Sequence, residues 1–184
     1  MLVKFSGFFF LCLLFSGCAT KGRLQWGCLR DATSIVFLEP SPIHSGDAYG
    51  YLPQHTMIVD TNKIQKLMTE LISSKPVDNY MLIGHLSKLV VLDQNSEPLG
   101  ILGIINYRCV VTFHPCVKRD GVFFNTWGEQ ASVPELMVQS EVFVSFVYEY
   151  MEQFLPEKLR KLEKEYAPHG ETLKDLLFNI PKEK

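Results

Sequence analysis

The stretch LGILGIINYRCVVTF, residues 99–113, decides the fold. Apolar residues or glycine occupy every second position, which predicts an extended chain with one buried face. That face would carry Leu99, Ile101, Ile105, Tyr107, Cys109, Val111 and Phe113. Because strands rarely exceed about ten residues, we expect a hairpin or a bulge near Asn106. The stretch therefore predicts the centre of a β-sheet.

Flanking segments extend this sheet in both directions. Upstream, MLIGHL and KLVVLD (residues 81–86 and 88–93) favour strands, and QNSEPLG after them favours a turn. Downstream, KRDG predicts a turn before VFFNTW, and SIVFL (residues 34–38) is a further candidate strand within a loop-like region. The strands follow one another without long crossovers, which favours an antiparallel sheet of about 4–6 strands.

Helical periodicity surrounds the strands. Asp60 is a candidate N-cap for a helix over residues 61–72. The motif Ser132-Val133-Pro134-Glu135 fits a capping box, and a wide apolar face follows it up to residue 155. Pro156 begins a more charged helix, and a short one follows Gly170. The order predicts an α+β domain with helices on one face of the sheet and a helical C-terminal part.

The N-terminus has the composition of an export signal. Lys4 precedes an apolar run, FFFLCLLF at residues 8–15, and Lys21 and Arg23 follow it. The run is shorter than the roughly 20 residues that cross a bilayer. A charged start, an apolar middle and small residues at the exit predict a signal peptide over residues 1–17.

The end of this signal, Phe15-Ser16-Gly17-Cys18, resembles the lipobox of bacterial lipoproteins. The resemblance covers residues 1–19 and implies cleavage after Gly17 and lipidation of Cys18, whose acyl chains would hold the chain at a membrane. Leucine is the usual residue at the position of Phe15, so ordinary signal cleavage is the alternative. Ala19 in place of Asp implies, for a Gram-negative source, a periplasmic protein of the outer membrane.

Composition predicts a single domain beyond the signal. We expect residues 18–33 to be the lipidated cysteine and a tether, and residues 34–184 to be one globular α+β domain. Without residues 1–17 and their one charge, Lys4, 167 residues remain with a formal net charge of −3. A chain of that length buries close to 70% of its unfolded surface. The acidic balance, without a basic stripe, argues against a nucleic-acid partner.

Three cysteines remain in the predicted domain: Cys28, Cys109 and Cys116. An export compartment permits disulfides, but three thiols leave one over, and the spacing leaves the pairing open.

No motif predicts a metal, a cofactor or a catalytic group. Neither Cys109 nor Cys116 has a second cysteine at C-x₂₋₄-C spacing, and the chain lacks a G-x-S-x-G elbow. The enzymatic alternative is a periplasmic hydrolase that uses Cys116 with His114, because Lys118 and Arg119 could lower the pKa of that thiol.

We therefore expect a lipid-anchored envelope protein with a non-enzymatic protein- or ligand-binding domain. An immunity-type inhibitor and an accessory subunit of an envelope assembly both fit this description. Its partners would be the membrane and another envelope or secreted protein. Tyr49, Tyr51 and Trp127 are the candidate recognition patch, because aromatic side chains are enriched at interfaces.

Overall fold

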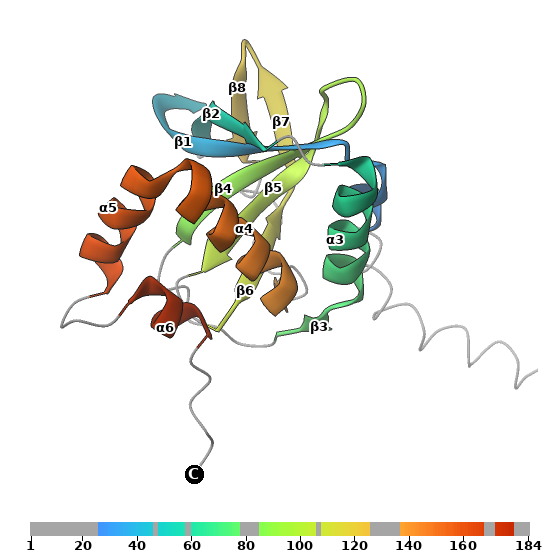
Figure 1. The fold of residues 1–184 in the computed structure, drawn as a ribbon. Coiled ribbons are helices and arrows are strands. Elements are labelled where there is room, and N and C mark those ends of the chain that lie inside the picture. Colours follow the sequence, from blue (N-terminus) through green and yellow to red (C-terminus); the bar gives the residue numbers. More distant parts are fainter. Residues whose placement is uncertain are drawn as a thin grey trace, which may run out of the picture.

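One antiparallel sheet with helices on one side forms the domain (Figure 1). The computed structural model describes residues 26–45, 48–57, 60–77, 85–105, 108–125, 137–167 and 172–178. The predicted α+β class is confirmed. The described sheet has nine strands, however, and not the 4–6 expected.

Every ladder between the described strands is antiparallel. The strands are β1 Ser34–Ser45, β2 Ala48–Met57, β3 Lys75–Pro76, β4 His85–Leu92, β5 Pro98–Ile105, β6 Val110–His114, β7 Cys116–Arg119, β8 Val122–Asn125 and β9 Met137–Gln139. Their order across the sheet is β3-β9-β6-β5-β4-β1-β2-β8-β7.

The longest additional strand, β2, comes from a segment that we expected to be loop. Residues 39–45 and 48–57 continue SIVFL into a long hairpin, although they contain Pro40, Pro42 and Pro53. Proline cannot donate a ladder hydrogen bond, and the β1–β2 pairing shifts register twice along this hairpin. The other strands that we did not expect, β3, β7 and β9, have only two to four residues each.

The expected reversal within residues 99–113 is confirmed. β5 and β6 pair antiparallel, with Leu102 opposite Phe113. Arg108 and Cys109, which precede β6, have positive φ angles of 54° and 53°. Asn106 itself lies outside the described residues.

The described helices are the 3₁₀ helix η1 Cys28–Asp31 and the α-helices α3 Thr61–Ser73, α4 Glu141–Phe154, α5 Pro156–Tyr166 and α6 Leu173–Phe178. Polar side chains cap the first turn of helices α3 and α4, and a proline begins α5. The Asp60 carboxylate accepts from the amide of Asn62 at 2.7 Å, as the N-cap prediction requires. None of the described helices is both long and apolar enough to cross a membrane.

Helix α4 starts later than predicted. Ser140 caps it, accepting from the amide of Phe143 at 3.1 Å. The predicted capping box at residues 132–135 lies outside the described residues, and Met137–Gln139 form strand β9 between β6 and β3. Val138 is buried there opposite Val111, so strand pairing prevails over helical periodicity at this point.

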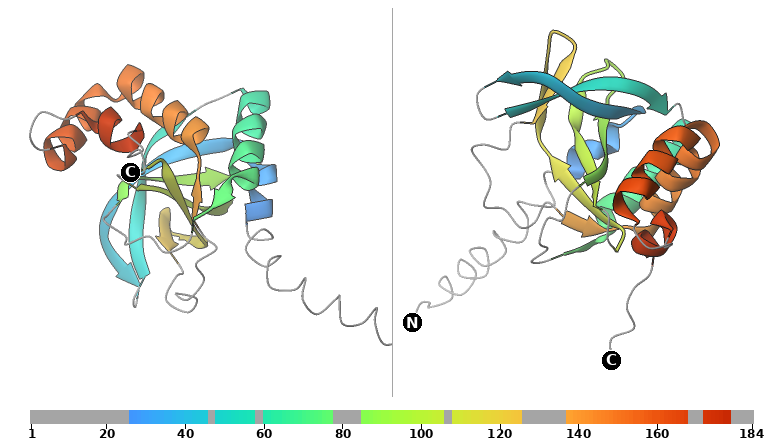
Figure 2. Two further views of the ribbon diagram at one scale, coloured as in Figure 1. Left: turned by 90° about the horizontal axis from the view of Figure 1, so that it is seen from below. Right: turned by 90° about the vertical axis from the view of Figure 1, so that its left-hand side faces the viewer.

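The sheet curls (Figure 2), and each of its faces carries an apolar core. Phe37, Leu89 and Leu102 face the helices and pack with residues such as Phe143 of α4. The opposite face has a smaller core, whose buried members are Val36, Leu38, Tyr51, Val90, Leu92, Ile101 and Phe123. Because Phe123 belongs to β8, the end of the sheet folds back over its centre.

The folded domain begins before Ser34. Trp26, Leu29 and Ala32 are buried in the core on the helix side, and the Trp26 ring lies 5.2 Å from the ring of Phe113. Residues 26–33, which we expected to be tether, are therefore part of the domain.

Substitution of Gly100 by alanine should destabilise the domain by about 1–3 kcal/mol. A Cβ at this position would collide with the ring of Phe113 on the neighbouring strand. Urea unfolding of the purified chain measures the loss. The matched control is Gly27→Ala, because a Cβ there has no atom within 4 Å and the φ of −58° suits alanine. Equal stability of the two variants would contradict this packing.

Candidate functional site

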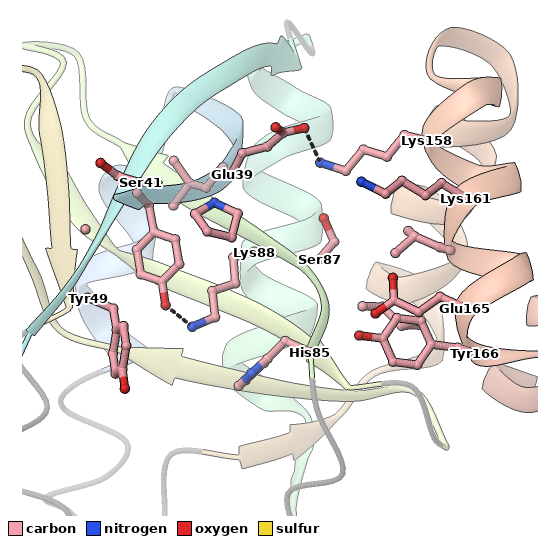
Figure 3. A pocket seen from close by; sticks show the side chains of 16 residues that line it. Glu39, Ser41, Tyr49, His85, Ser87, Lys88, Lys158, Lys161, Glu165 and Tyr166 are labelled. Carbon is pink, nitrogen blue, oxygen red and sulfur yellow. Dashed lines mark hydrogen bonds and ion pairs between the residues drawn. The ribbon is translucent and has the colours of Figure 1, made fainter. Parts of the chain in front are cut away.

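The sheet opens where β1 leaves β4. These strands pair from Ser34 opposite Leu92 to Leu38 opposite Lys88, and the ladder ends there. Beyond this point β1 continues with β2 alone, and Pro40 pairs with Tyr51. Residues 39–41 of β1 and 85–87 of β4 therefore line a gap, which α5 closes from the side. The result is a cavity of about 540 Å³, shown in Figure 3.

One face of α5 forms the outer wall of the cavity. The residues of that face are Lys158, Lys161, Leu162, Glu165 and Tyr166. Their spacing of three and four positions places them on one side of a helix. Leu159, on the adjacent side, is buried in the apolar core and fixes the helix against the domain.

A β-bulge shapes the floor of the cavity. His85 lies opposite Ile105 and Ser87 lies opposite Ile104, so Leu86 is an extra residue in β4. Ser87 is only 6% exposed, and its hydroxyl has no hydrogen-bond partner within the described structure. A buried polar group without a partner costs about 1–3 kcal/mol. A ligand in the cavity could supply that partner.

Lys88 and Tyr51 meet at the inner end of the cavity. The Lys88 ammonium donates a hydrogen bond to the Tyr51 hydroxyl and lies 4.4 Å from the centre of its ring. Burial lowers the pKa of Lys88 to about 8, because the charged form loses hydration. Burial also raises the pKa of Tyr51, which keeps that hydroxyl protonated.

His114, which is buried, and His85, which is half-buried, lie next to this pair. His85 Nε2 is 3.0 Å from the Thr112 hydroxyl, which is 2.8 Å from His114 Nε2. Burial, with a smaller contribution from Lys88, lowers the pKa of His85 to about 4. Burial, followed by the neighbouring His85 and Lys88, lowers the pKa of His114 to about 3. Both rings are therefore neutral at physiological pH.

Some charged side chains of the cavity have a partner of opposite charge and others do not. Lys158 Nζ lies 3.9 Å from a carboxylate oxygen of Glu39. The Glu165 carboxylate has Tyr166 as its hydrogen-bond partner, and this bond raises the pKa of Tyr166. Lys88 and Lys161 have no carboxylate within ion-pair distance in the part of the chain that the structure describes. Two cationic groups are therefore available to an anion.

Two members of the predicted recognition patch lie together in this site. Tyr49 and Tyr51 both line the cavity from β2, with Tyr49 63% exposed and Tyr51 buried at 7%. The third member, Trp127, lies outside the described residues, as do Gly17 and Cys18.

None of the three cysteines of the described structure lines the cavity. Cys28, Cys109 and Cys116 are thiols and not disulfides in the described structure. Burial, together with a smaller effect of Cys28, raises the pKa of Cys116 to about 12, which is unfavourable for a thiolate nucleophile beside His114. The described residues contain no group of three or more His, Cys, Asp or Glu side chains that could hold a metal ion.

Sequence reasoning missed Ser87, Lys88 and the lysines of α5. Lys88 does carry a signal, because it is a charged residue between apolar positions of a strand. The signal of α5 is its periodicity, with lysines recurring beside Leu162 on one face. Neither pattern reveals that the two elements line one cavity.

The stability of the domain should fall as the pH drops from 7 to 4. The folded pKa values of His85 and His114 lie below the ordinary 6.5, so the unfolded chain binds protons first. Each histidine then contributes a loss of up to about 1.4 kcal/mol per pH unit below 6.5. Urea unfolding at several pH values measures the slope. In His85→Gln, which keeps a polar group near Thr112, the slope should be smaller; an unchanged slope would contradict this assignment.

Comparisons of the chain with protein-family models, with curated proteins and with solved structures find no match. Its function is therefore inferred from the geometry of the cavity and from the N-terminal sequence.

Proposed function

We propose that this chain is a lipid-anchored envelope protein whose domain binds an anionic, partly apolar ligand in the cavity between β1, β2, β4 and α5. The protein acts by binding and not by catalysis. In this proposal Cys18 carries the lipid, and the domain lies on the periplasmic side of a membrane, the outer one in a Gram-negative source.

The cavity carries the binding half of the proposal. Its volume of about 540 Å³ falls within the roughly 300–1,000 Å³ of small-molecule sites. Leu38, Leu86 and Leu162 give it apolar walls, whereas Lys88 and Lys161 offer cations. Such sites combine apolar lining with a few polar groups that orient the ligand.

The Ser87 hydroxyl is the single most informative group. It is buried in the floor of the cavity without a hydrogen-bond partner in the described structure. Buried hydroxyls are normally paired, and a bound oxygen or nitrogen would remove the cost of leaving this one alone. Together with the two lysines, it favours a ligand with a carboxylate or phosphate head and a hydrocarbon or aromatic body.

The N-terminal sequence supports the location. The segment Phe15-Ser16-Gly17-Cys18 after a short apolar run resembles a lipoprotein signal. Acyl chains contribute about 0.8 kcal/mol per buried CH₂, and two or more give lasting attachment. We place the protein partners of the chain in the same envelope; Ile43 and Tyr49, both exposed on the β1–β2 hairpin, offer apolar contact there.

Octanoate should bind the full chain in a maltoside detergent more tightly than octan-1-ol, which has the same chain length without charge. Lys161→Gln should weaken octanoate binding by roughly fivefold to tenfold. A hydrogen bond to a charged group contributes about 1.5–3 kcal/mol. A difference of about 1.4 kcal/mol changes an affinity tenfold. Because Lys161 is exposed, we expect a contribution below this range. Isothermal titration calorimetry measures both affinities.

Lys164→Gln is the matched control, because Lys164 lies on the same helix but does not line the cavity. It should leave the affinity for octanoate unchanged. Ser87→Ala should weaken binding about threefold to tenfold without loss of stability, as expected for one neutral hydrogen bond. Equal binding of octanoate and octan-1-ol, or equal effects of the two lysine variants, would reject an anion site.

Protein isolated from its native host should begin at Cys18 and carry acyl chains, which mass spectrometry of the N-terminal peptide measures. Cys18→Ser should leave an unacylated precursor, because serine lacks the thiol that accepts the diacylglycerol. Cys12→Ser is the control, since Cys12 lies within the predicted signal and should not affect acylation. An unacylated wild-type chain that begins at Met1 would refute the lipid anchor.

A further inference from the structure

We infer that Lys88 is a covalent attachment site, whose amine condenses with an aldehyde or ketone group of the ligand to form an imine. This inference rests on the proposed binding cavity and adds the chemical class of its ligand. That class is a carbonyl compound which also bears an anionic group.

The position of Lys88 suits a nucleophilic amine. Its side chain is half-buried, lines the cavity and ends at the Tyr51 hydroxyl (Figure 3). No carboxylate forms an ion pair with it among the described residues, so the protonated amine lacks its usual stabilising partner. The neighbouring His85 ring is neutral, so it leaves the charge of the protonated amine uncompensated.

The amine is deprotonated often enough to react. With a pKa of about 8, about a quarter of the Lys88 side chains are neutral at pH 7.5. For a lysine at its ordinary pKa of about 10.4, the neutral fraction at that pH is on the order of a hundred times smaller. Desolvated lysines of this kind form Schiff bases with carbonyl compounds.

Imine formation needs no oxidant or reductant. The lone pair of Lys88 Nζ forms a bond to the carbonyl carbon, and the π electrons move to the oxygen. The two amine protons pass to that oxygen, which leaves as water when the C=N bond forms. The Tyr51 hydroxyl can give its proton to the oxygen and recover one from the nitrogen, because burial keeps this hydroxyl protonated.

The wall formed by α5 could bind the anionic group of the ligand. Lys161 projects from α5 towards the cavity, whereas Lys88 projects from β4 (Figure 3). A ligand held at one end by the imine could therefore place a carboxylate or phosphate at Lys161. The Ser87 hydroxyl lies on the floor between these walls.

Reductive labelling of the full chain tests the inference. The chain, in a maltoside detergent at pH 7.5, is treated with limiting benzaldehyde or 4-carboxybenzaldehyde and sodium cyanoborohydride, and peptide mapping locates the benzylated lysines. Lys88 should be labelled at least tenfold more than Lys161, the reference within the same cavity. The carboxylated aldehyde should label Lys88 faster than benzaldehyde does, and Lys161→Gln should remove that difference.

Two variants separate chemistry from folding. Lys88→Arg keeps the positive charge and should abolish the mapped adduct. Tyr51→Phe keeps the ring and should slow labelling of Lys88 while the labelling of Lys161 stays unchanged, a pattern that general unfolding would not produce.

The failures of the two proposals are distinguishable. If octanoate binds but benzaldehyde labels Lys88 no more than Lys161, the imine site is refuted and the anion-binding cavity stands. If benzaldehyde labels Lys88 selectively but octanoate does not bind, the reactive lysine stands and the anion site is rejected.

Discussion

The pairing of β1 with β4 is the constraint on which the candidate site depends. Up to Leu38 and Lys88 the two strands share a ladder, and beyond this pair β1 follows only β2. A gap between neighbouring strands would normally close or fill with side chains. Here α5 covers it, and the bulge at Leu86 turns the end of β4 so that Ser87 lines the floor. The cavity is thus a consequence of strand separation and not of a loop.

Burial explains the unusual electrostatics beside the cavity. The ladder between β1 and β4 ends at Lys88. The side chain of Lys88 therefore lies between the apolar core of the curled sheet and the cavity. Desolvation by burial lowers its pKa and those of His85 and His114. Lys88 donates to the Tyr51 hydroxyl, and both histidine rings bond to the Thr112 hydroxyl, so the partners of these groups carry no charge. We propose that the resulting chemistry is that of a partly deprotonated amine in the same cavity as the cationic Lys161.

The cysteines have a different role from the one that their number suggested. Cys109 donates to the carbonyl of Leu177 at 3.2 Å, and Cys28 contacts the carbonyl of Leu99 at 3.5 Å. Burial raises the pKa of Cys109 and of Cys116 to about 12 in each case. In the described structure these side chains act as small apolar residues that pack α6 and the N-terminal segment onto the sheet. Their environment does not favour nucleophilic chemistry.

The sequence by itself determined the local features: the alternation of the β5–β6 hairpin, the Asp60 cap and the helix that starts at Pro156. These depend on neighbours a few residues apart, so periodicity and capping reveal them. Only the tertiary structure decided that the Pro-rich residues 39–45 and 48–57 form strands, that Met137–Gln139 pair with β6, and that Lys88 and Lys161 line one cavity. Those outcomes depend on strand register and on contacts between distant segments. The free energy of such contacts is not encoded in any single stretch of the chain.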